Sequence, residues 1–125
     1  MIKGIHHVAL KCCGNEEYEK VVGFYRDVLG LEVLRSWSEG MMLTTGAGII
    51  EIFNNGDDHP SQGAIRHFAF CTDNVDEVAE AVRTAGYEVF FEPKDIRIQS
   101  DPVFPARIAF CRGPLGEEIE LFQEK

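Results

Sequence analysis

The chain has 125 residues, with 21 acidic side chains against 12 basic ones and a formal charge of -9. Such an acidic surface disfavours nucleic acids and anionic membranes, because both are bound mainly through Lys and Arg. With 45% hydrophobic residues, nine of them Phe, the composition is that of a globular protein with a core, and the length fits one domain.

The first half predicts one strand, one helix and three further strands. Alternating hydrophobicity predicts a strand over about residues 4–12. Helical spacing of apolar residues predicts a helix from about Glu16 to Leu29, with Asn15 as N-cap and Gly30 just past its end. Strands are then expected near residues 31–36, 40–45 and 48–53.

The second half predicts the same order, βαβββ. Its strands are expected near residues 64–72, 87–91, 106–112 and 117–123, and its helix from about Val75 to Ala85, capped by Asp73 or Asn74. Between the halves lies a segment dense in turn-forming residues. We therefore expect one α+β domain over residues 1–125, with module one at about 1–55, a linker at about 56–63 and module two at about 64–125.

Sequence similarity between the halves supports an internal repeat. Three segments match in the same order: 5–10 with 65–70, 30–33 with 86–89, and 50–53 with 119–122. Neither half is long enough to bury a large core alone, so the two are expected to pack together or to exchange between chains.

The repeat places one His and one Glu at equivalent positions in each half. His7 and His67 lie on the opening strands, and Glu51 and Glu120 lie within apolar closing strands. Any one of them alone is more often a structural residue or a solvated one. Because buried carboxylates need a partner, two His and two Glu at matched positions favour a ligand set for a divalent transition metal.

Other polar residues have less claim to a function. His6 competes with His7 for the first position but aligns with Arg66, and His59 is interpreted as a loop residue. Charged residues around Glu16–Glu19 are interpreted as a solvated helix face. The cysteines, at 12, 13, 71 and 111, show no metal-binding or disulfide spacing and are expected to be free, mostly buried thiols. With no signal-peptide pattern, a cytoplasmic protein is expected.

Four segments resemble the vicinal oxygen chelate superfamily, also called the glyoxalase/bleomycin-resistance/dioxygenase fold. They cover residues 7–10, 24–31, 66–70 and 113–121, and include Phe-Tyr-x-x-x-Leu-Gly-Leu and Pro-x-Gly-x-x-Ile-Glu-Leu. The resemblance implies two βαβββ modules in a curved mixed sheet, with helices on the convex face. It also implies four metal ligands: His7, Glu51, His67 and Glu120. That set is the one found in glyoxalase I.

The resemblance further implies a metal-dependent lyase or isomerase that works through an enediolate, on the hemithioacetal of a 2-oxoaldehyde and a thiol or a similar small substrate. Glu120 is then the first choice for the general base, with Glu51 as its symmetry-related partner. The implied cofactor is Ni, Co or Zn, with Fe or Mn as further candidates, in a homodimer. The alternatives are a metal-free drug-binding protein of bleomycin-resistance type and an epimerase or dioxygenase on the same scaffold.

Three features bear on the substrate. Lys11 replaces an Arg of the short bacterial glyoxalase I pattern, which keeps the charge but loses the bidentate fork. Asn55 matches a glutathione-contacting Asn of that pattern. The segment 92–105 is longer than the pattern, and its prolines predict a stiff loop that is either a lid or a structural excursion.

Overall fold

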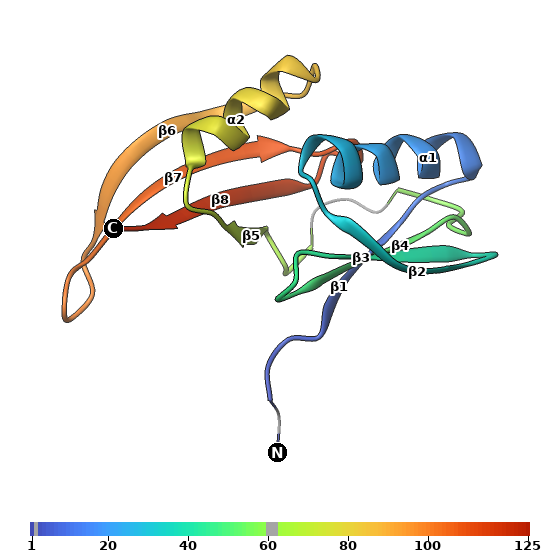
Figure 1. The fold of residues 1–125 in the computed structure, drawn as a ribbon, viewed down its shortest axis with the longest axis horizontal. Helices are drawn as coiled ribbons and strands as arrows, with labels where there is room; N and C mark the ends of the chain where they lie inside the picture. The colour runs from blue at the N-terminus through green and yellow to red at the C-terminus, as the bar shows by residue number, and fades with distance from the viewer. Residues whose placement is uncertain (2, 60–62) are drawn as a thin grey trace. The chain divides into compact units, whose positions relative to one another are not determined.

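The structure is a computed structural model that describes residues 1, 3–59 and 63–125. The chain divides into two compact units, Met1–Ser61 and Gln62–Lys125, and each is described by itself (Figure 1). Most of the expected linker is described, but residues 60–62 lie outside the described part of the chain. None of the helices in the described part is both long and apolar enough to cross a membrane.

Both units have the order βαβββ, which confirms the predicted α+β fold and the internal repeat. In unit 1 the sheet order is β1-β4-β3-β2, and in unit 2 it is β5-β8-β7-β6; only the β1–β4 and β5–β8 pairs are parallel. The elements of unit 1 are β1 (His7–Lys11), α1 (Asn15–Gly23), a π-helical turn (Phe24–Val28), β2 (Glu32–Trp37), β3 (Gly40–Thr44) and β4 (Ile49–Phe53). Those of unit 2 are β5 (Phe68–Cys71), α2 (Val75–Thr84), β6 (Val89–Ile98), β7 (Phe104–Arg112) and β8 (Glu118–Glu124).

The first helix differs from the sequence prediction at both ends. Asn15 was expected as the N-cap, but the cap position is Gly14, whose φ of 89° suits glycine, and Asn15 is the first helical residue. After Gly23 the helix continues as the π-helical turn, in which the Leu29 amide donates to the Phe24 carbonyl. Gly30 then ends the segment with a φ of 78°, as the sequence predicted.

The second helix follows its sequence signals closely. Of the two candidate caps, Asn74 occupies the N-cap position, and its side chain accepts a hydrogen bond from the Glu77 amide. Val75, Ala79 and Val82 are buried at helical spacing, and α2 packs against β6, β7 and β8.

Strand alternation sets the two faces of each sheet. Ile50 and Ile52 in β4, like Ile119 and Leu121 in β8, are at most 3% exposed and belong to the cores of their units. In a strand, neighbouring side chains point to opposite faces, so the residue between each pair, Glu51 or Glu120, points to the other face. This alternation directs one carboxylate of each unit away from its apolar core.

The segment 92–105 is not the stiff loop that its prolines predicted. Most of it belongs to a hairpin of β6 and β7, in which Asp95 pairs with Arg107 and Ile98 with Phe104. β6 tolerates Pro93 because it is the edge strand of its sheet and Pro93 lies where the register shifts, between Phe91 and Lys94. The stiff-loop prediction was therefore wrong for the strand residues of this segment, and only residues 99–103 form the turn. A lid role for the hairpin stays a prediction.

Candidate metal centre

In unit 1, His7 and Glu51 lie side by side on neighbouring parallel strands. The register of β1 and β4 sets Ala9 opposite Glu51, which places His7 two residues earlier on the same face as Ala9. His7 Nε2 is 3.4 Å from Glu51 Oε1. The Glu51 side chain is 11% exposed and that of His7 is 37% exposed, so the carboxylate is largely enclosed while the imidazole stays accessible.

Unit 2 repeats this arrangement at the same register. Ala69 in β5 lies opposite Glu120 in β8, and His67 precedes Ala69 by two residues. His67 Nε2 is 3.3 Å from Glu120 Oε1, with side-chain exposures of 40% and 14%. The two units of the chain therefore hold the same pair of side chains at the same register and at nearly the same distance.

Each His–Glu pair fits a shared divalent metal ion in its donor chemistry and its spacing. Imidazole nitrogen and carboxylate oxygen are borderline-to-hard ligands that suit zinc, nickel and cobalt. Two such atoms, each about 2.0–2.2 Å from a tetrahedral zinc ion, lie about 3.3–3.6 Å apart. The observed separations of 3.4 and 3.3 Å match that spacing without any movement of the side chains.

The surroundings of the two pairs differ in one respect. Phe110 pairs in register with Glu120, and its ring lies edge-on to His67 with the centroids 5.2 Å apart. The position that corresponds in unit 1, opposite Glu51, is Met42. The neighbouring strand therefore places an aromatic ring beside the pair in unit 2, and a methionine opposite the carboxylate of the pair in unit 1.

Of the two adjacent histidines at the start of β1, only His7 contacts a carboxylate among the described residues. The His6 ring lies edge-on to His7, with the two Nδ1 atoms 2.9 Å apart. This contact orients the His7 ring and leaves its Nε2 directed at Glu51.

The two expected substrate-binding residues lie at one end of the β1–β4 pair. Lys11 ends β1 on the same face as His7, and a Cβ at Gly56 would lie only 2.8 Å from Lys11 Cγ. The side-chain amide of the neighbouring Asn55 donates to Glu39 Oε2 at 2.8 Å. Contact of either residue with a substrate stays a prediction.

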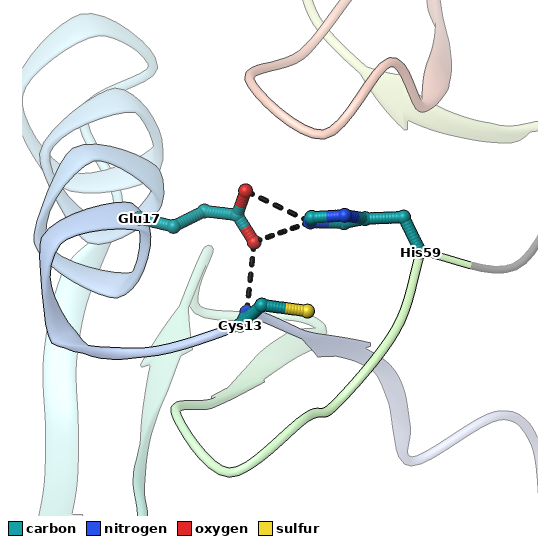
Figure 2. Close-up of side chains that lie close together, drawn as sticks. All are labelled: Cys13, Glu17 and His59. Carbon is teal, nitrogen blue, oxygen red and sulfur yellow. Dashed lines mark hydrogen bonds and ion pairs between the residues drawn. The ribbon is translucent and has the colours of Figure 1, made fainter.

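The sequence interpretation missed a second cluster, formed by Cys13, Glu17 and His59 (Figure 2). The sequence predicts a loop residue at 59 and mostly buried thiols. His59 does lie in the loop after β4, but its Nε2 also lies 2.8 and 2.9 Å from the two Glu17 carboxylate oxygens, and Cys13 is half-buried. Cys71 is exposed, whereas Cys111 is buried as expected. The spacing of Cys13 and Glu17 by four residues was the only local signal, and His59 lies far along the chain.

The fold and the two His–Glu pairs together define a class: paired βαβββ modules, each presenting the same potential ligands on one sheet face. The chain belongs to the Glyoxalase/Bleomycin resistance protein/Dioxygenase superfamily, whose family model matches residues 4–121. This superfamily contains both enzymes and non-enzymes. Its members bind small molecules, often with a divalent metal, and often dimerise.

Solved structures with the same fold cover nearly the whole chain. A glyoxalase family protein from Enterococcus faecalis is 26% identical, with a TM-score of 0.71 over 96% of this chain and 97% of that one. The fosfomycin resistance protein FosX from Listeria monocytogenes is 22% identical, with a TM-score of 0.75 over 100% and 96%. Lactoylglutathione lyase from Agrobacterium tumefaciens is 21% identical, with a TM-score of 0.65 over 98% and 95%. No curated protein matches the chain.

Proposed function

We propose that this protein is a metal-dependent lyase or isomerase of glyoxalase I type, acting on the hemithioacetal of a 2-oxoaldehyde and a thiol. The observation that carries the proposal is the repeated His–Glu pair, at the same register in both units and at 3.4 and 3.3 Å. A structural role for one such pair would not require its duplication. A two-His, two-Glu ligand set does require it.

In this proposal His7, Glu51, His67 and Glu120 hold one divalent ion, with Ni, Co or Zn as the candidates. When bound, the metal supplies Lewis-acid stabilisation of the negative charge that develops on the substrate oxygens. The protein supplies the proton transfer. Glu120 is the general base that removes the proton next to the carbonyl, and Glu51 is its counterpart in the other unit.

The burial of the two carboxylates supports this division of roles. Both side chains are less than 15% exposed, so water competes poorly for their oxygens. A carboxylate that is shielded from bulk water and positioned beforehand needs little reorganisation at the moment of proton transfer. Phe110 beside His67 adds to the exclusion of water on the side of Glu120.

Lys11 and Asn55 are proposed to bind the thiol portion of the substrate. Lys11 offers a flexible cation suited to a carboxylate of the thiol carrier. Asn55 can offer its amide only after exchanging its hydrogen bond to Glu39 for one to the substrate. We therefore expect the preference among thiols to differ from that of enzymes with an Arg at the Lys11 position.

We further propose that the protein forms a homodimer and lies in the cytoplasm.

The test begins with the protein stripped of metal by a chelator. Nickel, cobalt or zinc is then restored, and turnover of methylglyoxal is followed with glutathione and with other small thiols. The proposal predicts activity that depends on added metal and is lost in His7→Gln and His67→Gln. Bound metal without turnover for any thiol would refute the reaction while leaving the metal site intact.

A drug-binding function of the bleomycin-resistance type is the second candidate, because a charge of -9 suits a cationic ligand. The double variant Glu51→Gln/Glu120→Gln separates the two. Metal-free binding of a cationic drug that this double variant retains would favour the second candidate. An epimerase or dioxygenase would be recognised by turnover of its own substrate class.

A further inference from the structure

The cluster of Cys13, Glu17 and His59 lies apart from the His–Glu pairs and plays no part in the proposed reaction. Its members come from two segments of unit 1: Cys13 just before α1 and Glu17 in its first turn, and His59 from the loop that follows β4 (Figure 2). One ligand atom from each, a sulfur, an oxygen and a nitrogen, lies within 4.8 Å of the other two.

Backbone contacts hold the two segments together. The Cys12 amide donates to the Phe53 carbonyl at 2.8 Å, and the Gly56 amide donates to the Cys12 carbonyl at 2.9 Å. Cys13 and Asn55 form an isolated antiparallel bridge. The close approach needs a glycine, because a Cβ at Gly56 would lie 2.9 Å from the Cys12 carbonyl oxygen. The three side chains therefore meet through the fold of the backbone and do not depend on their own contacts alone.

The donor set is that of a zinc-class cation. Thiolate, imidazole and carboxylate together favour zinc and cobalt over calcium or magnesium, which take oxygen ligands. Around a tetrahedral ion these atoms would lie about 3.3–3.6 Å apart. His59 Nε2 and the Glu17 oxygens are already closer than that, at 2.8 and 2.9 Å, so the widest separation in the set, at most 4.8 Å, must shorten by up to about 1.2–1.5 Å.

The charge around the cluster also favours a cation. The Cys13 amide and His59 both bond to Glu17 and hold the pKa of its carboxyl below the usual range. Partial burial, together with the negative charges of Glu17, Asp58 and Asp57, raises the pKa of the Cys13 thiol. Without a cation this thiol is therefore a weak nucleophile, and its Sγ donates to the Asp58 carbonyl at 3.2 Å. A bound cation would reverse this balance by stabilising the thiolate.

We propose that Cys13 Sγ, Glu17 and His59 Nε2 form a second divalent-metal site, for zinc or a similar borderline cation, with its fourth position open to water. Binding releases the thiol proton to solvent. The site joins residues 54–59 to the start of α1, and therefore stiffens the segment that carries Asn55. It stands independently of the proposed enzyme activity.

Titration of the full-length, metal-free protein with Co²⁺ tests the proposal, because only a sulfur ligand gives a thiolate-to-cobalt charge-transfer band in the near ultraviolet. The His–Glu pairs contain no sulfur and cannot produce this band, so the two sites are read separately. We expect the band in the wild type, its loss in Cys13→Ser, and its retention in the matched control Cys71→Ser.

A second variant keeps the test decisive if Cys13→Ser does not fold. His59 is exposed and lies in a loop, so His59→Gln should retain the fold. It should weaken Co²⁺ binding at the sulfur site by at least the roughly 10–100-fold that loss of an outer-shell partner costs. Absence of the band in the wild type, or an unchanged titration in folded Cys13→Ser or His59→Gln, would overturn the proposal.

Discussion

Replacement of Glu120 by Gln separates a catalytic role for this residue from a structural one. Gln has nearly the same size, and it can still place an oxygen next to His67, but it cannot accept a proton at neutral pH. The contact that changes, at 3.3 Å, joins a carboxylate 14% exposed to an imidazole 40% exposed. Such a partly exposed pair contributes about 0–1 kcal/mol to folding, so the free energy of unfolding should change by less than about 1 kcal/mol.

The expected effect on the reaction is much larger. Loss of a general base costs about 10²–10⁴-fold in rate, which corresponds to about 2.7–5.5 kcal/mol of activation free energy. The assay measures kcat and KM on the methylglyoxal hemithioacetal, with bound metal counted in the same samples and stability followed by urea unfolding. The matched control is Glu118→Gln, two residues earlier on β8, which removes the charge from the ion pair with Arg112 at 3.2 Å.

Glu118→Gln should lose as little stability as Glu120→Gln while keeping the activity of the wild type. If metal-loaded Glu120→Gln turns over within about tenfold of the wild type, Glu120 is not the base, because tenfold is only about 1.4 kcal/mol. If both variants lose activity equally, the effect belongs to the strand and not to the carboxylate.

Three further outcomes follow from packing and charge. Leu43→Ala should lower the free energy of unfolding, measured with urea, by about 2–5 kcal/mol, because Leu43 is 0% exposed. The control Leu34→Ala, at a position 44% exposed, should lower it by less than about 1 kcal/mol. Equal losses would contradict the described core of unit 1. The bidentate hydrogen bonds from Arg107 lower the pKa of Asp76. This pair therefore stabilises unit 2 above the ordinary carboxyl pKa, and the effect is lost as the pH falls through the lowered value. In Asp76→Asn, the free energy of unfolding should depend less steeply on pH in the acid range. Burial raises the pKa of the Cys111 thiol to about 12, so alkylation at pH 8 should modify Cys111 only after denaturation, as read by mass spectrometry; rapid native labelling would contradict its burial.

The sequence was most informative where the two halves repeat each other. Equivalent segments around His7 and His67 predicted the same order of elements in both halves, and the structure shows that order with matching parallel registers of Ala9 with Glu51 and of Ala69 with Glu120. Strand parity then sufficed to direct each carboxylate away from the apolar core. These features depend on local alternation, which a single sequence records well.

Features that depend on tertiary contacts were harder to predict. Pro93 indicated a loop, but it lies at an irregularity in an edge strand, where a missing amide hydrogen costs little. The π-helical turn at Phe24–Val28 has the same apolar spacing as the α-helix before it. His59 joins Glu17 only because the chain returns to the start of α1, and nothing in the intervening sequence marks that return.

The proposed function requires that one His and one Glu from each unit bind a catalytic divalent metal. It is tested most directly by a crystal structure of the nickel-loaded protein, with an anomalous difference map recorded at the nickel absorption edge. We predict a peak about 2.0–2.2 Å from Nε2 of His7 and His67 and from a carboxylate oxygen of Glu51 and Glu120. A metal-loaded crystal with no peak at these four residues, including one in which nickel occupies only the Cys13 cluster, would contradict it.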